Sequence, residues 1–489
     1  MHKKNILIVG LVVVCVFYIV HLIIGYIPVN NGSGFDGLVY LNYIQSLGLG
    51  SSIKNDPYRT LRMSGFLPLI AASAFGFSQK ALIELQAFLN IGMFSIAAAL
   101  FYDSLHKLKV KQETAIISVV VLVASWPFLV MPVFYPVLSD NVALAFSCAC
   151  LWCWTKSYQW VIYIFCAYFL WLHPGLFLIP FIFAAMPLKM NSSSISTQVK
   201  YGLWPSLFFI ISAIFLVFGM VYDIVKIRTG DIIDHVNGSG IRSGNGQIAL
   251  PDLIPLSGIV MIFALLIVLW AFIRLISDRN TWKSISPSGL FFASLFIATS
   301  GLVMFKSLDW SSGMNGPPIL WFMKLQSLAA PLKPLVSHFV NYGPVIILSI
   351  LSILRSVFRN KTSIPKALLV TLIVFLPFLL FGSESRQWIG IFPIAVAVFA
   401  LANYSRWQRI CCLVFSLIVL FPAFWLKDGL SKAVESQLSF QSPQWQLYFG
   451  RMGPWMSVET YEIGLLGLII FLLLIKILEK KNVSNISST

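Results

Sequence analysis

Apolar segments of membrane-spanning length recur from one end of this chain to the other. Of its 489 residues, 58% are hydrophobic and only 11% are charged, too few to solvate a globule of this size. Because a membrane helix needs about 20 mostly apolar residues, the pattern predicts an all-α, polytopic transmembrane helix bundle with about 12 to 14 membrane helices. No stretch is long enough for a separate soluble domain, so residues 1–489 are expected to form a single membrane domain. The expected segments are 5–27, 81–102, 114–134, 137–154, 158–172, 174–188, 201–222, 253–273, 286–305, 335–354, 367–382, 387–402, 410–426 and 461–478.

The charge distribution orients these segments. With the N-terminus in the cytoplasm, the inner loops and the adjoining segment ends hold twenty of the 34 Lys and Arg residues, as the positive-inside rule requires. The whole formal charge of +16 then falls on the inner face, where the only acids are Asp103, Glu113, Asp278 and Glu479. We therefore expect both termini in the cytoplasm and the polar loops with chemical potential outside. The basic pI reflects this topology, and no nucleic-acid partner is expected.

The first outer loop, residues 28–80, opens with a stretch typical of an interfacial helix, GFDGLVYLNYIQSL. Helical spacing places four side chains on one face, namely Asp36, Tyr40, Tyr43 and Leu47. Tyrosines anchor such a helix along the membrane surface, and Gly48 is expected to end it.

Two arginines follow in NDPYRTLR. Asp56 is expected to cap a short helix that has Pro57 at its first position. Arg59 and Arg62 then lie on one side, three residues apart. The apolar stretch 64–77 holds only about 14 residues, so it is expected to be re-entrant or interfacial rather than a full span.

The second outer turn, FYPVLSDNVALAF, places Asp140 at the mouth of the fourth segment. Ser139 and Asp140 either cap that helix or supply a functional carboxylate, and the pattern leaves both interpretations open. In LHPGLFLIP, Pro174 breaks the helix and leaves His173 at headgroup depth, where a lone histidine is either structural or catalytic.

The later outer loops add further candidates. Lys333 and His338 lie at the end of the outer loop 306–334 and just beyond it. In FGSESRQWIGIFP, Glu384 and Arg386 are confined to a hairpin of a few residues. They either pair with each other, for at most about 1 kcal/mol if exposed, or Arg386 binds a phosphate bidentately. The late outer loop 427–460 is the longest after the first.

Carboxylates, arginines and aromatic residues at headgroup depth suit a sugar carried on a polyprenyl phosphate. The lipid tail lies between helices and the phosphate needs fixed cations. An acceptor hydroxyl needs a carboxylate that takes its proton as it attacks the anomeric carbon. Asp36 should therefore share a cleft with the arginines. The candidates are Asp36 and Asp140 as catalytic residues, Arg59, Arg62 and Arg386 as donor phosphate-binding residues, and Tyr40, Tyr43, Tyr58, His173, Lys333, His338 and Glu384 as acceptor or donor contacts.

These stretches resemble the GT-C class of integral-membrane glycosyltransferases. FDGLVYLNYI with Asp36 is similar to the aspartate that follows the first membrane helix in that class, and YPVLSDNVALAF with Asp140 to its second-loop aspartate. DPYRTLRMSGFLP resembles the Tyr-Arg-x-x-Arg…Pro stretch of bacterial members, and SESRQWIGIFP their Glu-x-Arg…Pro hairpin. The resemblance implies that Asp36 is a catalytic base or a metal-linked acid, that a divalent metal is permitted but not required, and that the membrane is a bacterial plasma membrane.

Unlike the oligosaccharyltransferase and O-mannosyltransferase branches, the chain has no large soluble outer domain. This difference favours a lipid-linked or cell-surface glycan as the acceptor over a protein. The expected partners are thus the lipid bilayer, a polyprenyl-phosphate-linked sugar donor and a glycan acceptor.

Three other classes of protein compete with this interpretation. An O-antigen-type polysaccharide polymerase or ligase also has many helices and outer arginines, but it usually gathers them in two large outer loops. A transporter is less favoured, because few ionisable residues lie near a mid-membrane position and no matched pair of interrupted helices stands out. A membrane scaffold would be insensitive to Asp36→Ala and Arg62→Ala.

Overall fold

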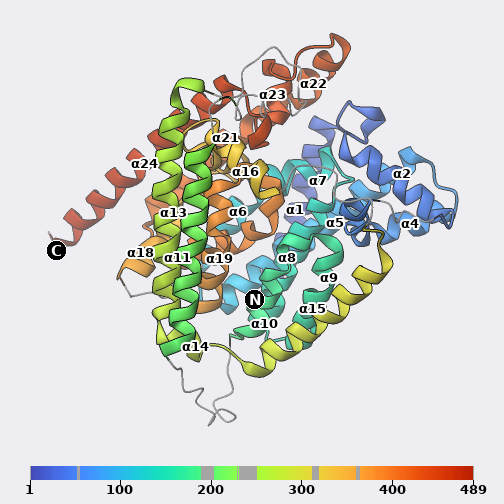
Figure 1. The fold of residues 1–489 in the computed structure, drawn as a ribbon. Coiled ribbons are helices and arrows are strands. Elements are labelled where there is room, and N and C mark those ends of the chain that lie inside the picture. The colour runs from blue at the N-terminus through green and yellow to red at the C-terminus, as the bar shows by residue number, and fades with distance from the viewer. Residues whose placement is uncertain are drawn as a thin grey trace.

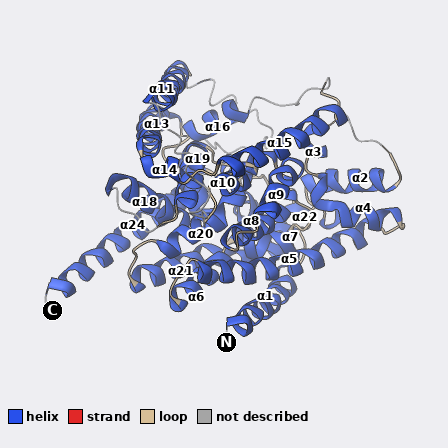
Figure 2. Ribbon diagram, turned by 90° about the horizontal axis from the view of Figure 1, so that it is seen from below, coloured by secondary structure: helices blue, strands red, loops and turns tan. Residues whose placement is uncertain are grey.

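The fold is built from helices alone in the part of the chain that the structure describes. The structure is a computed structural model, and it describes all residues except 1, 52–55, 189–202, 228–229, 231–249, 311–318, 360–363 and 488–489. It is 82% helical, with no strand among the described residues (Figure 2). The expectation of an all-α chain is therefore confirmed.

The helices follow one another along the whole chain (Figure 1). The α-helices are α1 His2–Ile24, α2 Asp36–Gly48, α3 Pro57–Thr60, α4 Leu67–Ala74, α5 Gln79–Lys107, α6 Gln112–Val123, α7 Met131–Phe134, α8 Ser139–Thr155, α9 Gln159–Leu172, α10 Leu178–Ala185, α11 Leu203–Lys226, α13 Ile254–Ser277, α14 Arg279–Lys283, α15 Pro287–Ser307, α16 Ile319–Leu328, α17 Lys333–Tyr342, α18 Val345–Arg359, α19 Lys366–Phe381, α20 Phe392–Leu401, α21 Arg406–Leu420, α22 Leu426–Glu435, α23 Pro443–Phe449 and α24 Val458–Ser487. The short 3-10 or π turns are η1 Asn30–Gly32, η2 Met63–Phe66, η3 Trp126–Val130, η4 Pro174–Leu176, η5 Pro251–Leu253, η6 Ser385–Ile391, η7 Phe421–Trp425 and η8 Gly453–Trp455.

Six helices among the described residues are long and apolar enough to cross a membrane. A seventh span results if α6 and the segment Trp126–Phe134, which are bent by 68° relative to each other, count as one. The six are Lys4–Ile24, Gln79–Lys107, Pro251–Ser277, Pro287–Ser307, Arg406–Glu435 and Val458–Glu479. The chain thus has the helices of a multi-pass membrane protein, but fewer uninterrupted spans than the expected number of about 12 to 14.

Several expected segments are shorter because the backbone is interrupted within them. Gly343, with φ of 81°, separates α17 from α18 inside the expected segment 335–354. The expected segment 387–402 begins with the turn η6 and becomes α-helical only at Phe392. A left-handed glycine followed by proline, as at Gly343, cannot continue an α-helix. Apolar helices of 10–17 residues result.

The ion pairs divide the molecule into the two faces that the charge pattern predicts. Each acid assigned to the inner face contacts a basic side chain assigned to the same face. These pairs are Asp103 with Lys156 at 2.7 Å, Glu113 with Arg406 at 2.8 Å, Asp278 with Lys366 at 2.5 Å and Glu479 with Arg355 at 3.1 Å. The pairs described below, at Asp36, Asp56 and Asp140, join only residues assigned to the other face. The partition into two faces is therefore consistent with the tertiary contacts.

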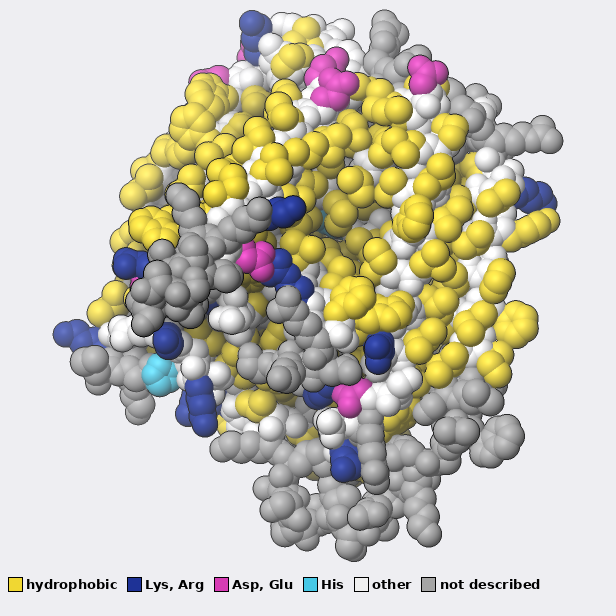
Figure 3. Space-filling view, turned by 90° about the vertical axis from the view of Figure 1, so that its left-hand side faces the viewer, with side chains coloured by type: hydrophobic (Ala, Val, Ile, Leu, Met, Phe, Trp, Pro, Cys, Tyr) yellow, Lys and Arg dark blue, Asp and Glu magenta, His cyan; other side chains and the backbone are white. Residues whose placement is uncertain are grey.

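The surface agrees with a lipid-facing bundle. Figure 3 shows one side of the molecule, where hydrophobic side chains cover most of the described surface and acidic side chains lie along its upper rim. Large exposed apolar residues are numerous on α1, α15 and α24. Such an apolar belt is expected of a protein whose solvent is the bilayer.

The two longest loops that the charge pattern assigns to the outer face, 28–80 and 427–460, lie together. In Figure 1, α2 and α4 are at the upper right and α22 and α23 at the top, whereas α14 is at the bottom. Phe35, directly before α2, packs its ring 5.6 Å from Phe449 and 6.5 Å from Tyr448 of α23. This aromatic contact fixes the start of α2, and hence Asp36, against the C-terminal part of the chain.

The helix predicted after residue 35 is present as α2, which begins at Asp36 and ends at Gly48. Its buried residues are Gly37, Tyr40, Leu41 and Ile44. The face that packs on the protein is therefore turned by about one residue from the face of Asp36, Tyr40, Tyr43 and Leu47, and it includes Gly37 against Tyr135 and Tyr40 against Phe66.

Candidate active site

A carboxylate, a guanidinium and a second carboxylate meet where the start of α2 touches the hairpin formed by residues 383–387, which includes the start of η6. Arg386 Nη1 lies 3.0 Å from Asp36 Oδ2, and Arg386 Nε donates to Glu384 Oε1 at 2.9 Å. The exposed fractions of the side chains are 35% for Asp36, 19% for Arg386 and 12% for Glu384. Burial alone would lower the pKa of Arg386, but the two carboxylates raise it well above its ordinary value. The sequence left open whether Arg386 pairs with Glu384 or binds a phosphate. In the structure Arg386 pairs with Glu384 and also with Asp36.

The backbone of the hairpin is held from behind by α17. His338 Nδ1 lies 2.8 Å from Ser385 Oγ, and Ser337 Oγ donates to the Ser383 carbonyl at 2.5 Å. The Tyr342 hydroxyl donates to the Ser385 carbonyl. All five residues are buried. His338, predicted as a ligand contact, therefore lies behind the hairpin, where it contacts Ser385 and supports Arg386.

The backbone of Asp36 is fixed by the second outer turn. The Gly37 N–H donates to the Tyr135 hydroxyl at 2.9 Å. A Cβ atom at Gly34 would lie 2.5 Å from the Tyr135 ring, and one at Gly37 would lie 2.8 Å from it, so only glycine admits the ring at either position. Sequence reasoning missed Tyr135, although a tyrosine beside the second-loop aspartate and two glycines flanking Asp36 were visible signals.

Arg62 is a buried cation beside this group. Its guanidinium carbon lies 4.3 Å from the centre of the Tyr58 ring, and Nη2 donates to Gln387 Oε1 at 3.2 Å. Burial opposes its charge, but the nearby Tyr58, Tyr40 and Asp140 raise the pKa of Arg62 above its ordinary value. Gln387, next to Arg386 in the chain, thus links the second arginine to the same hairpin. No sequence pattern singled out this glutamine.

Asp140 and His173 form a second buried pair. His173 Nε2 lies 3.3 Å from Asp140 Oδ1, with both side chains less than 5% exposed. Burial, and then the charge of Arg62, lower the pKa of His173 below its ordinary value of 6.5, so the imidazole is neutral at pH 7. The capping interpretation of Ser139 and Asp140 is wrong, because Leu138 occupies the N-cap of α8 and no side chain caps the helix.

Arg59 is less available than Arg62. Its guanidinium lies 2.9 Å from Asp56, which also accepts the Arg59 N–H at 3.2 Å and the Tyr43 hydroxyl at 3.0 Å. Asp56 caps α3 with Pro57 at the first position, as the sequence predicts. Tyr43 and Arg59 are thus held by Asp56, at the edge of the group rather than at its centre.

Two other predicted contacts are deeply placed. Tyr40 is buried on α2, where its ring lies 5.3 Å from that of Phe66. Lys333 opens α17 and is 1% exposed, and burial lowers the pKa of its amine to about 7.

The described residues offer no ready-made metal centre. No three or more His, Cys, Asp or Glu side chains gather there in an arrangement that could hold a metal ion. What the arrangement can do is bind an anion that displaces a carboxylate from a guanidinium, since Arg62 and Arg386 both lie within reach of the charge of Asp140 and Arg386 pairs with Asp36.

No family model, curated protein or solved structure matches the chain.

Proposed function

We propose that the protein is a membrane glycosyltransferase that transfers a sugar from a polyprenyl-phosphate donor to an extracytoplasmic acceptor, a lipid-linked or cell-surface glycan. One observation carries the proposal, the contact of 3.0 Å between Asp36 and Arg386 at the rim of an apolar helix bundle. It brings a potential proton acceptor and an anion-binding group together, in segments that the charge pattern predicts to lie at headgroup depth on the outer face.

The reaction assigns one role to each group. An acceptor hydroxyl attacks the anomeric carbon of the donor sugar, and its proton passes to the Asp36 carboxylate. The bond between the anomeric carbon and the phosphate oxygen breaks, and the lipid phosphate leaves with the bonding electrons. Arg386 stabilises the charge that develops on that oxygen. The buried Arg62 adds a second positive charge nearby. Asp140 lies behind, next to the neutral His173.

The donor has to compete with Asp36 for Arg386. Asp36, Arg386 and Glu384 together carry a formal charge of about −1, so a phosphate is repelled unless one carboxylate moves away. Asp36 is the more exposed of the two, and it contacts Nη1, whereas Glu384 holds Nε from a more buried position. The phosphate therefore takes the place of Asp36 on Arg386, and the carboxylate is released to act on the acceptor hydroxyl only when a donor is bound.

Lipid analysis of cells that lack the protein tests the function. We expect a polyprenyl-phosphate sugar to accumulate and a surface-glycan sugar to be lost. Wild-type protein should reverse both effects and Asp36→Asn should not, since loss of a general base costs about 100-fold or more in rate. Glu84→Gln is a matched control, because Glu84 is an exposed acid that pairs with the exposed Lys80 at 4.0 Å.

Two outcomes would contradict the proposal. Full complementation by Asp36→Asn would remove the role of the carboxylate. Accumulation of complete glycan repeat units on a polyprenyl pyrophosphate, rather than of a single sugar phosphate, would indicate a polymerase or ligase instead.

A further inference from the structure

Two apolar grooves flank α21 on different sides. Each has one polar end, but the polar ends lie toward opposite faces of the molecule. The first groove, with a volume of about 640 Å³, lies between α17, α21 and α24. Phe339, Ile418 and Ile463 are among its apolar lining residues, and Gln446 and Thr460 are polar ones. These residues come from the late outer loop and from the neighbouring halves of α21 and α24, so this groove opens at the face that carries Asp36.

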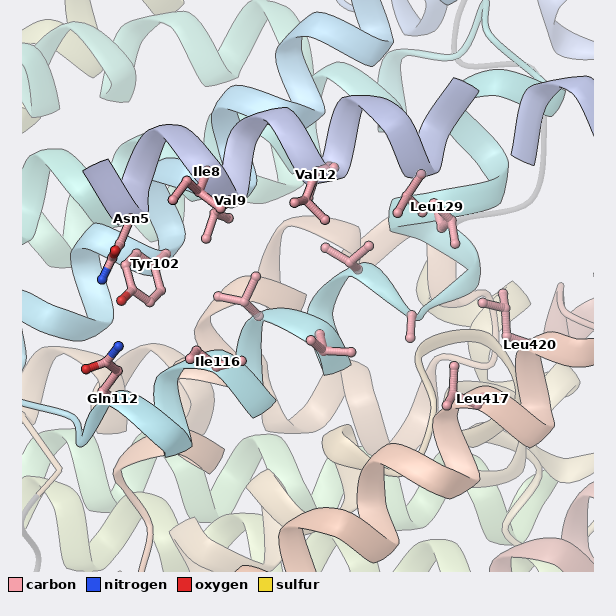
Figure 4. Close-up of a pocket in the computed structure, with 16 residues that line it drawn as sticks. Asn5, Ile8, Val9, Val12, Tyr102, Gln112, Ile116, Leu129, Leu417 and Leu420 are labelled. Atoms are coloured by element: carbon pink, nitrogen blue, oxygen red, sulfur yellow. The ribbon is translucent and has the colours of Figure 1, made fainter. Parts of the chain in front are cut away.

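The second groove, with a volume of about 530 Å³, lies between α1, α6 and α21 (Figure 4). Asn5, Tyr102 and Gln112 gather at one end of it, and Leu417 and Leu420 lie at the other. Its polar end is formed by residues next to the inner loop that follows α5. A lipid with its headgroup on the side of Asp36 would thus meet a polar end only in the first groove.

The first groove also leads toward Arg386. Gln446, which lines it, donates through Nε2 to the Trp455 carbonyl at 3.1 Å. The Trp455 ring lies 5.9 Å from the guanidinium carbon of Arg386. A single tryptophan therefore separates the polar end of the groove from the proposed phosphate site.

Arg451, a cation that lines the groove, already binds backbone carbonyls and an aromatic ring. Arg451 donates to the carbonyls of Val340 at 3.0 Å and Val419 at 2.7 Å, and it lies over the Trp126 ring at 4.6 Å. Glu459, also in the lining, is exposed. A phosphate gains little there, and Arg386 remains the better partner for it. The groove is suited to hydrocarbon, and Gly464 and Gly467 on α24 leave room in it because they have no side chain.

We propose that the groove between α17, α21 and α24 is the binding site for the polyprenyl chain of the donor. This assignment rests on the proposed function. The chain runs from a phosphate at Arg386 past Trp455 and into the apolar part of the groove. Because the unbound chain already lies in hydrocarbon, its affinity for the groove comes from van der Waals contacts with the lining residues.

Binding of prenyl phosphates to the full-length protein in lipid nanodiscs tests the site. The variant Ile463→Trp fills the groove with a side chain from its open edge, and Ile116→Trp is the matched control in the groove of Figure 4. Ile463→Trp should weaken binding of a long-chain polyprenyl phosphate about tenfold, as expected for the loss of about ten van der Waals contacts between the chain and the groove. It should leave binding of citronellyl phosphate, too short to fill the groove, unchanged, which also shows that the variant is folded.

The outcomes separate the groove from the function. Unchanged long-chain affinity in Ile463→Trp, or an equal loss in Ile116→Trp, would overturn the groove and leave the proposed function intact. Cross-linking of a long-chain phosphate with a photoreactive chain end should label α21 or α24, and labelling of α1 or α6 would also overturn it. If wild-type protein bound neither phosphate, the proposed function itself would fail.

Discussion

At the scale of single residues, the charge and the backbone of Asp36 are held by different parts of the chain. Arg386 contacts its carboxylate and Tyr135 binds the N–H of the next residue. The carboxylate can therefore exchange its partner while the backbone stays in place. This separation is what the proposed release of the base by donor phosphate requires.

Histidine 173 should make stability depend on pH. It is neutral in the folded protein, because burial lowers its pKa, whereas the unfolded chain binds a proton near pH 6.5. The unfolded state then holds more protons below that pH. Stability should be full above pH 6.5 and fall as the pH decreases, by at most about 1.4 kcal/mol per pH unit.

Thermal unfolding in detergent between pH 7.5 and 5 measures this effect. The variant His173→Gln should show a shallower pH dependence than wild type. His106→Gln is the control, since His106 lies on the exposed surface at the end of α5. Equal slopes in wild type and His173→Gln would show that His173 is not the group that titrates.

At the scale of elements, one buried arginine joins the ends of two helices. Arg451 binds the Val340 carbonyl in the last turn of α17, where helical carbonyls lack a partner within the helix, and the Val419 carbonyl near the end of α21. A cation is also favourable at a helix C-terminus. The hairpin that carries Arg386 is held by α17. By binding the end of α17, Arg451 therefore helps to hold that hairpin in place.

Replacing Arg451 should therefore destabilise the fold. Arg451→Met removes two charge-assisted hydrogen bonds to partly buried carbonyls, at a cost of about 2–4 kcal/mol. The midpoint of thermal unfolding measures this loss.

Arg406→Met provides the comparison for Arg451→Met. Arg406 pairs with Glu113 at 2.8 Å, but both side chains are more than half exposed, so its loss should cost less than about 1 kcal/mol. An equal midpoint for the two variants would refute the role given to Arg451.

At the scale of the whole molecule, the ion pairs and the charge pattern assign the same residues to two faces. The assignment of one face to the outside is a prediction that labelling can test. Ser436→Cys lies in the late outer loop and Ser157→Cys in an inner loop, and both positions are exposed. A membrane-impermeant thiol reagent added to intact cells should label only Ser436→Cys. Labelling of Ser157→Cys alone would invert the topology and place Asp36 in the cytoplasm.

Much of the architecture could be predicted because it follows from local properties. Apolar composition requires a helical membrane protein, since backbone groups in lipid must be satisfied within the helix. The cap at Asp56 and the break at Pro174 depend on neighbouring residues only, and both are present. The number of uninterrupted spans was not predictable in the same way, because the breaks at Gly343 and before Trp126 lie inside apolar runs.

The sequence by itself determined an all-α fold of apolar helices and the partition of charge between two faces, because hydropathy and positive charge act through the solvent. Only the tertiary structure decided which charges touch. Asp36 and Arg386 are 350 residues apart, and Arg62 reaches Gln387 across a similar separation. Their contact depends on how Tyr135, the hairpin and α17 pack, and a long-range packing arrangement leaves no periodic signal in the chain.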